Sequence, residues 1–207
     1  MAITTEQRTE LLQLTLAMFG ATPGAHYLSE FAAIIESGAT TENLANALDD
    51  TAVFTSLYPN FLTTNEFAVR FVDNLVGDLV PQSAKAWAVL AIEDKLDAGA
   101  TRGEVMWWAA QTLDATPYAS SNWGAAAEAF DNQVVCPEYY SVNQQQSSSD
   151  LLTLQNVLAG VTNDPATIDA AESAIDGNLP SSGETFALTT GLDNLTGTGG
   201  DDLFLGL

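Results

Sequence analysis

The sequence has very few of the side chains from which most catalytic and metal-binding sites are built. Its 207 residues include one cysteine, Cys136, and one histidine, His26. A single cysteine excludes an internal disulfide and a cysteine zinc site, and a single histidine cannot assemble a catalytic triad or a histidine metal site from scattered acids. We therefore expect a non-catalytic protein in which Cys136 is a buried, unreactive thiol and His26 is structural or merely exposed.

Motifs for nucleotide chemistry, signal peptides and membrane spans are also missing. No nucleophile-elbow, P-loop or dinucleotide glycine pattern opens a strand–helix unit. No run of about twenty apolar residues occurs, so we expect no transmembrane segment. The first residues, MAITTEQRTELLQ, lack the basic start and apolar centre of a signal peptide, and we do not expect export through one.

Basic residues are scarce and unevenly distributed. Five lysines and arginines stand against 27 aspartates and glutamates, which gives a net charge of −22 at pH 7. The last base is Arg102, and residues 103–207 contain none. Such a chain repels phosphate backbones and anionic lipid heads, so we expect no nucleic acid as a partner. Contact with a polyanionic cell envelope would need bridging cations.

Helix start and stop signals are dense over residues 1–116. Threonines of capping boxes precede apolar stripes of helical period, prolines open two further helices, and glycines end most of them. We therefore predict an all-α fold for this region. The predicted helices follow Thr4, Pro23, Thr40, Thr63, Pro81 and Thr101, and the glycines that end them are Gly20, Gly38, Gly77 and Gly99.

The order of helices and turns in this region occurs twice. The turns Ser37-Gly38-Ala39-Thr40 and Ala98-Gly99-Ala100-Thr101 begin 61 residues apart, and each follows a helix that opens at a proline. One such unit alone would struggle to bury its apolar faces. A duplicated three-helix unit is the economical interpretation, and we assign residues 1–116 to a duplicated helical domain.

Residues 117–178 form a second predicted helical block. One helix is expected over residues 122–135, with Pro137 interrupting it. A polar linker over 143–150 (NQQQSSSD) separates it from two shorter helices. These two are expected over 151–159 and 164–175.

Aromatic residues concentrate between residues 87 and 140, where all the tryptophans lie. Trp107 and Trp108 are adjacent, so one helix cannot direct both toward the same core. Two interpretations stay open for the group. Its members either cement the two helical blocks together, or stack on pyranose rings while a neighbouring amide binds sugar hydroxyls. The candidate carbohydrate-binding residues are Asn122, Trp123, Trp107 and Trp108.

The last twenty residues, 188–207, are rich in glycine and aspartate and have no helical pattern. Glycine permits turns that direct backbone carbonyls to one point, and a following aspartate adds a charged oxygen of the kind that calcium takes. We predict a strand over residues 185–189 and a Ca²⁺ site after it, which needs further stacked turns to complete the metal's shell. Its candidate ligands are Gly197, Gly199, Gly200 and Asp202.

Three stretches resemble parts of bacterial RTX proteins. Residues 197–204, GTGGDDLF, are similar to one copy of the nine-residue repeat G-G-x-G-x-D-x-U-x, with Thr198 where a second glycine is usual. Residues 130–177, from FDNQVVCPEYYSV to ATIDAAESAIDG, resemble a segment that commonly precedes such repeats. Residues 5–115 resemble a helical domain of unknown function, distantly like phycobilisome linkers, that occurs in RTX and surface-layer proteins.

The resemblance implies an all-α fold with a duplicated helical unit and a second helical block, followed over residues 179–207 by the start of a calcium-binding β-roll. It also implies the N-terminal region of a longer surface-layer protein or adhesin, secreted by the type I route to the bacterial cell surface. The expected role is non-catalytic anchoring or assembly through lipopolysaccharide or another surface polysaccharide, with self-assembly of the full-length protein. The alternative is a helical spacer or oligomerisation domain of a secreted RTX adhesin, toxin or hydrolase.

Overall fold

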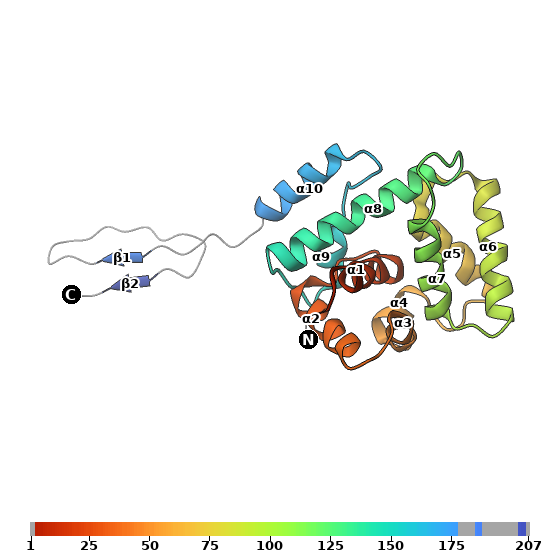
Figure 1. The fold of residues 1–207 in the computed structure, drawn as a ribbon, viewed down its shortest axis with the longest axis horizontal. Coiled ribbons are helices and arrows are strands. Elements are labelled where there is room, and N and C mark those ends of the chain that lie inside the picture. The colour runs from red at the N-terminus through yellow and green to blue at the C-terminus, as the bar shows by residue number, and fades with distance from the viewer. Residues whose placement is uncertain (1–2, 178–184, 188–202, 206–207) are drawn as a thin grey trace. The chain divides into compact units, whose positions relative to one another are not determined.

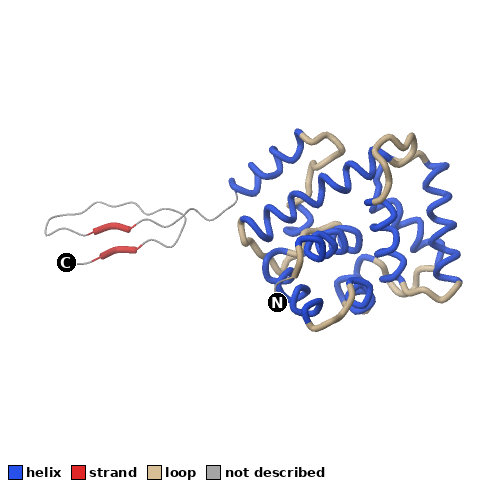
Figure 2. Tube along the Cα trace, in the orientation of Figure 1, coloured by secondary structure: helices blue, strands red, loops and turns tan. Residues whose placement is uncertain are grey.

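A computed structural model describes residues 3–177, 185–187 and 203–205, and the part up to residue 177 is all-α, as predicted (Figure 1; Figure 2). Most of its helices begin and end within a few residues of the predicted bounds. The α-helices are α1 (Thr5–Phe19), α2 (Gly24–Glu36), α3 (Thr41–Asp49), α4 (Ala52–Leu57), α5 (Thr64–Val76), α6 (Gln82–Asp97), α7 (Arg102–Asp114), α8 (Gly124–Glu138), α9 (Leu151–Asn156) and α10 (Ala166–Gly177), with a 3-10 turn at Gly77–Leu79 and a π-helical turn at Tyr139–Asn143.

The chain divides between Glu172 and Ser173 into two compact units. In the first unit, α1 contacts α2, α3, α4, α7 and α8, and Figure 1 shows it among them. Every residue of α1 from Leu11 to Met18 is buried. A helix buried on all sides belongs to the interior of a domain, and α1 is the helix around which the others pack.

The core of this unit contains helices from both predicted helical parts. The central helix α1 contacts α7, which precedes residue 116, and α8, which follows it. The apolar faces of the two parts are therefore buried against one another. The boundary between residues 116 and 117 stays a prediction.

Local capping explains where the helices begin. The side chain of Thr4 accepts a hydrogen bond from the backbone of Gln7, whose own side chain accepts one from the backbone of Thr4. The same reciprocal box opens α5 at Thr63 and Glu66. These boxes satisfy N–H groups that have no partner inside the helix, and they confirm the predicted helix starts.

The turns after α2 and α6 have the same backbone geometry. Gly38 and Gly99 have φ angles of 101° and 99°, a conformation that favours glycine. Each donates its N–H at 3.0 Å to the carbonyl three residues earlier. Thr40 and Thr101 then cap α3 and α7 with the same pair of hydrogen bonds.

The helices that follow these two turns, α3 and α7, approach each other closely at Gly103. A Cβ atom on Gly103 would lie only 2.4 Å from the carbonyl oxygen of Ala45. The backbone N–H of Gly103 also donates to the carboxylate of Asp49 at 2.8 Å. Glycine is therefore required here for close packing, and Asp49 satisfies the first turn of α7.

Arg102 fastens the start of α7 to the segment between α4 and α5. Its guanidinium donates to the carbonyl oxygens of Tyr58, Pro59 and Leu62 at 3.1–3.2 Å. It also lies over the ring of Phe67, 4.7 Å from the centroid. One partly buried cation thus binds three backbone carbonyls in the segment between two helices.

The prediction that Pro137 interrupts the helix before it is wrong. Helix α8 continues through Pro137 to Glu138 and then widens into the π-helical turn. This turn packs on α2, and the hydroxyl of Ser141 lies 2.8 Å from that of Thr22 in a buried contact. Tertiary packing thus offsets the hydrogen bond that proline cannot donate.

The second unit contains two short strands that pair in parallel, β1 (Thr185–Ala187) and β2 (Leu203–Leu205). The register sets Thr185 opposite Leu203 and Ala187 opposite Leu205. β1 falls within the stretch where the sequence predicts a strand. The predicted calcium ligands between the strands lie outside the described residues.

No helix in the described ranges combines the length and apolarity that crossing a bilayer requires.

We expect the substitution Gly103→Ala to lower the free energy of unfolding by roughly 3 kcal/mol, because the new methyl group meets backbone rather than a flexible side chain. Gly177→Ala is the matched control, since a Cβ there has nothing within 4 Å. Urea denaturation followed by far-ultraviolet circular dichroism measures both. Equal midpoints for the two variants would contradict the close approach of α3 and α7.

Candidate functional site: a tryptophan-lined groove

Trp107 and Trp108 lie on different faces of α7. Trp107 is only 5% exposed and belongs to the core, whereas Trp108 is partly buried and lines a groove. Consecutive residues of an α-helix are turned by about 100° from each other, so one residue packs inward while the next reaches the edge of the helix. Trp108 lies nearer the surface than Trp107, as one of the pair was predicted to, although it also packs against the core.

The groove collects three of the four tryptophans of the chain. Trp87 comes from α6, Trp108 from α7, and Trp123 from the residue before α8. We call this site, about 310 Å³ in volume, the tryptophan groove. It is completed by Phe71, Val72, Leu75 and Val76 of α5, Ala88 and Ile92 of α6, Ala109, Thr112 and Leu113 of α7, and Thr116.

The tryptophan groove offers broad aromatic faces and few polar groups. The side chain of Trp87 is exposed, with 76% of its surface accessible. Thr112 and Thr116 donate their hydroxyl protons to helix carbonyls at 2.7 and 2.8 Å, which leaves their oxygens as acceptors. The ammonium of Lys95 lies 4.3 Å from the centroid of the Trp108 ring, a cation–π contact at the groove's edge.

The structure brings together two of the four predicted carbohydrate-binding residues. Trp108 and Trp123 share the groove, whereas Trp107 is buried in the core and Asn122 is exposed without lining the groove. Trp87 was not among the candidates. The spacing of residues on α6 could have identified it. Ala84, Ala88 and Ile92 are four residues apart and form the packed stripe of this helix, and Trp87 lies next to that stripe.

A tight loop holds Trp123 in position. The segment between α7 and α8 turns back at Gly124, where a Cβ atom would lie 1.9 Å from the carbonyl oxygen of Tyr118. The hydroxyl of Tyr118 donates to the carboxylate of Asp131 on α8. The carboxylate partner raises the pKa of Tyr118 to about 12, so this hydroxyl stays a donor.

Asp131 belongs to a pair of carboxyl groups that joins α7 to α8. Burial and the neighbouring carboxyl of Asp114 raise the pKa of Asp131, while the Tyr118 hydrogen bond opposes that rise. Asp114 also accepts a 2.6 Å hydrogen bond from the side chain of Gln13 on α1. The pair therefore ties three helices together at a point where two negative charges meet.

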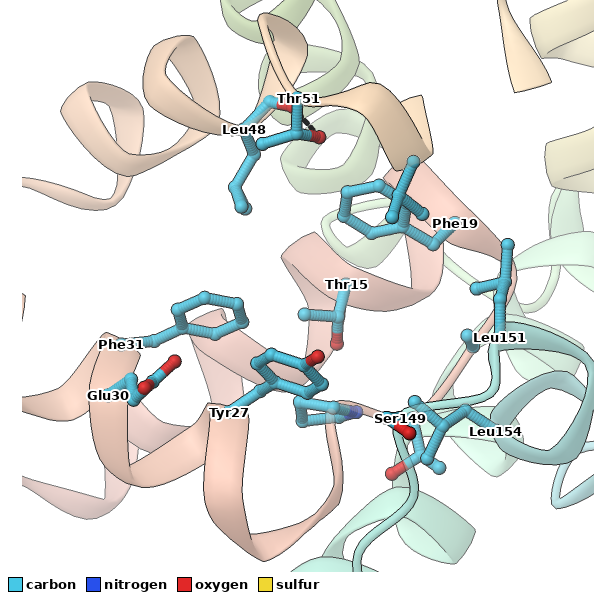
Figure 3. Close-up of a pocket in the computed structure, with 14 residues that line it drawn as sticks. Thr15, Phe19, Tyr27, Glu30, Phe31, Leu48, Thr51, Ser149, Leu151 and Leu154 are labelled. Carbon is cyan, nitrogen blue, oxygen red and sulfur yellow. Dashed lines mark hydrogen bonds between the residues drawn. The ribbon is translucent and has the colours of Figure 1, made fainter. Parts of the chain in front are cut away.

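A second groove, which we call the aromatic groove, lies between α1, α2 and α3 and has a volume of about 230 Å³. Figure 3 shows Tyr27, Phe31 and Phe19 around an open centre, with Glu30 beside Phe31. The rings of Tyr27 and Phe31 are stacked, with centroids 6.3 Å apart. The other lining residues are Thr15, Ala21, Thr22, Pro23, Leu48, Thr51, Val53, Ser149, Leu151 and Leu154.

No residue of the aromatic groove was a candidate from the sequence, although Tyr27 and Phe31 stand four residues apart on one predicted helix. That spacing equally describes a core stripe, and only the packing of α1 and α3 beside α2 makes it a groove.

The described side chains do not form a cluster of potential metal ligands. Within the described ranges, no group of three or more His, Cys, Asp or Glu residues is placed to hold an ion. The carboxylate of Asp49 accepts a hydrogen bond from the N–H of Gly103. Calcium binding by Gly197, Gly199, Gly200 and Asp202 remains a prediction, since those residues lie outside the described part.

The lone cysteine and histidine both have structural surroundings. Cys136 is fully buried, and burial raises the pKa of its thiol to about 11, which keeps it protonated and unreactive as predicted. His26 is exposed and pairs with Glu30 at 3.5 Å on the same helix.

The chain matches no protein-family model, no curated protein and no solved structure. Any ligand of the two grooves must therefore be inferred from the residues that line them.

Two tryptophan substitutions separate packing from exposure. We expect Trp107→Ala to lower the free energy of unfolding by about 3–5 kcal/mol, because it leaves a large cavity in the core. Trp87→Ala should change it by less than about 0.5 kcal/mol, because most of that side chain is already in water. Guanidinium denaturation of the two variants beside wild type measures the contrast. Similar losses for both would contradict the placement of Trp107 in the core.

The carboxyl pair predicts a pH dependence of stability. The pKa of Asp131 is higher in the folded protein than in the unfolded chain, so protonation of Asp131 stabilises the fold. This stabilisation is complete below the ordinary pKa of 3.8, and it is lost as the pH rises through the pKa of Asp131 in the folded protein. We expect wild type to gain stability relative to Asp131→Asn as the pH falls from about 7 to about 4. Tyr118→Phe should steepen this gain, because the hydroxyl that opposes the rise is removed. A difference that is constant with pH would overturn the assignment.

Proposed function

We propose that this chain is a non-catalytic anchoring or assembly module of a calcium-dependent RTX-type surface-layer protein or adhesin at the bacterial cell surface. Its helical part would bind a sugar of lipopolysaccharide or of another surface polysaccharide. The tryptophan groove is the single observation that carries this proposal.

The chemistry of the tryptophan groove suits a sugar ring. The apolar face of a pyranose packs on an indole ring, and Trp87 offers such a face to solvent with 76% of its surface exposed. The oxygens of Thr112 and Thr116 can accept hydrogen bonds from sugar hydroxyls. Lys95, beside Trp108, would meet a carboxylate or phosphate on an envelope polysaccharide.

The parallel strands support the proposed β-roll. Thr185 pairs with Leu203, a shift of 18 residues, and that shift equals two copies of a nine-residue repeat. One full turn of such a roll would therefore bring β2 beside β1 in this register. Calcium held by the glycine–aspartate turns would then lock the roll where the metal is abundant, and secretion by the type I route would follow from the resemblance to RTX proteins.

The proposed duplication has support in the matched turns. Gly38 and Gly99 share one φ angle and one hydrogen-bond pattern, and Thr40 and Thr101 cap the next helices alike. We accordingly propose two related three-helix units, α1–α3 and α5–α7, with α8, α9 and α10 as the second helical block.

The sugar-binding proposal is tested with purified lipopolysaccharide by surface plasmon resonance, in calcium and in chelator. We expect binding in calcium, and roughly tenfold weaker binding by Trp87→Ala, which corresponds to about 1.4 kcal/mol. Phe61→Ala is the control, because Phe61 is 83% exposed and lies outside the groove. No binding by wild type in either condition would refute the anchoring role.

Exposed apolar residues on α6 favour one alternative, a helical spacer or oligomerisation domain. Trp87 and Leu90 stand three residues apart and are 76% and 54% exposed, so they could pack on a second copy. Light scattering distinguishes this case. A dimer that Leu90→Gln returns to a monomer would support the oligomerisation domain, and a monomer in both calcium and chelator would exclude oligomerisation.

A further inference from the structure

The tryptophan groove and the aromatic groove occupy corresponding places in the two proposed helical units. The first lies between α5, α6 and α7, and the second between α1, α2 and α3. Where the units are aligned on their matched turns, 61 residues apart, four pairs of positions line both grooves. The pairs are Tyr27 and Ala88, Phe31 and Ile92, Leu48 and Ala109, and Thr51 and Thr112.

The first helix of each unit extends the correspondence. Thr15 and Phe19 of α1 align with Val72 and Val76 of α5 at a shift of 57 residues, and all four line their grooves. The shift is four residues smaller because α6, with 16 residues, is three residues longer than α2, with 13, and the connection before α6 is one residue longer than the one before α2. The two grooves are therefore the same surface of a repeated unit.

Each groove is also bordered by the second helical block. Leu151 and Leu154 close one side of the aromatic groove, as Figure 3 shows, and Trp123 closes one side of the tryptophan groove. The two sites thus share their walls and their border.

Aromatic rings reach the two grooves from different positions. At the aligned positions the aromatic groove has Tyr27 and Phe31, where the tryptophan groove has the smaller Ala88 and Ile92. The tryptophan groove is instead lined by Trp87, Trp108 and Trp123 at other positions. Both grooves therefore keep aromatic faces even though their sequences differ.

The polar groups of the aromatic groove suit hydroxyls. The Glu30 carboxylate lies beside the stacked Tyr27 and Phe31 rings in Figure 3, and its only ion-pair partner within the described residues is the exposed His26 at 3.5 Å. The hydroxyls of Tyr27 and Ser149 add a donor and acceptor each. Because a carboxylate repels anions, this groove favours a neutral or amino sugar.

We propose that the aromatic groove is a second carbohydrate site, specific for a neutral or amino sugar of the same polysaccharide that the tryptophan groove binds; this rests on the proposed function. Two sites on one chain make the second contact intramolecular, so a polysaccharide that spans both would be held more tightly than either sugar alone.

The tryptophans make the two sites separately observable. None of the four lines the aromatic groove, so tryptophan fluorescence reports on the tryptophan groove, whereas calorimetry counts both sites. The probe is a set of short oligosaccharides released from lipopolysaccharide by mild acid. We expect calorimetry of wild type to give about two molecules bound per chain.

Substitutions then assign the sites. We expect Tyr27→Ala to reduce the stoichiometry to one without changing the fluorescence titration, and Trp87→Ala to reduce it to one and remove the fluorescence change. Glu30→Gln, on an exposed position of α2, should weaken binding in the aromatic groove by roughly tenfold without affecting the fold.

The outcomes distinguish the two proposals. In the first outcome, wild type binds one molecule per chain, and binding is lost in Trp87→Ala and unchanged in Tyr27→Ala and Glu30→Gln. This result would overturn the second site and support the tryptophan groove. One molecule lost in Tyr27→Ala but retained in Trp87→Ala overturns the tryptophan groove and supports the aromatic one. No heat of binding with any oligosaccharide overturns both.

Discussion

The burial of α1 on every side is the constraint on which the described helices depend. The stretch from Leu11 to Met18 is buried on all its faces, and α1 is in contact with α2, α3, α4, α7 and α8. The close approach at Gly103 brings α3 onto α7 beside it, and Arg102 fastens the segment before α5. The cooperativity of the fold follows from this arrangement, since no subset of helices completes the core.

The grooves are a by-product of the same packing. In each three-helix unit the side chains leave a hollow between the helices. Between α5, α6 and α7, Ala88 and Ala109 are too small to close the hollow, and indole rings line its edges instead. Helix α7 separates this hollow from the core. Trp107 packs in the core, and the next residue, Trp108, lines the hollow.

Much of the fold was predictable because its signals are local. The capping box at Thr63 and Glu66 spans four consecutive residues. The turn at Gly99 depends on a positive φ angle at one residue, which favours glycine, so both features can be recognised in the sequence. The groove is not local. Asn122 adjoins Trp123 along the chain, yet lies outside the groove, while Trp87 reaches it from another helix. Pro137 failed as a helix terminator because the contact of the next turn with α2 outweighs its missing hydrogen bond.

The position of Arg102 has a practical consequence for proteolysis. It is the last base in the chain, so trypsin has no cleavage site in the 105 residues that follow it. Its guanidinium is engaged by three carbonyls and an aromatic ring, and its peptide bond lies in the first turn of α7. A protease must open that turn before it can cut. The rate at which trypsin releases an intact C-terminal half would therefore measure the rate at which α7 separates from its neighbours.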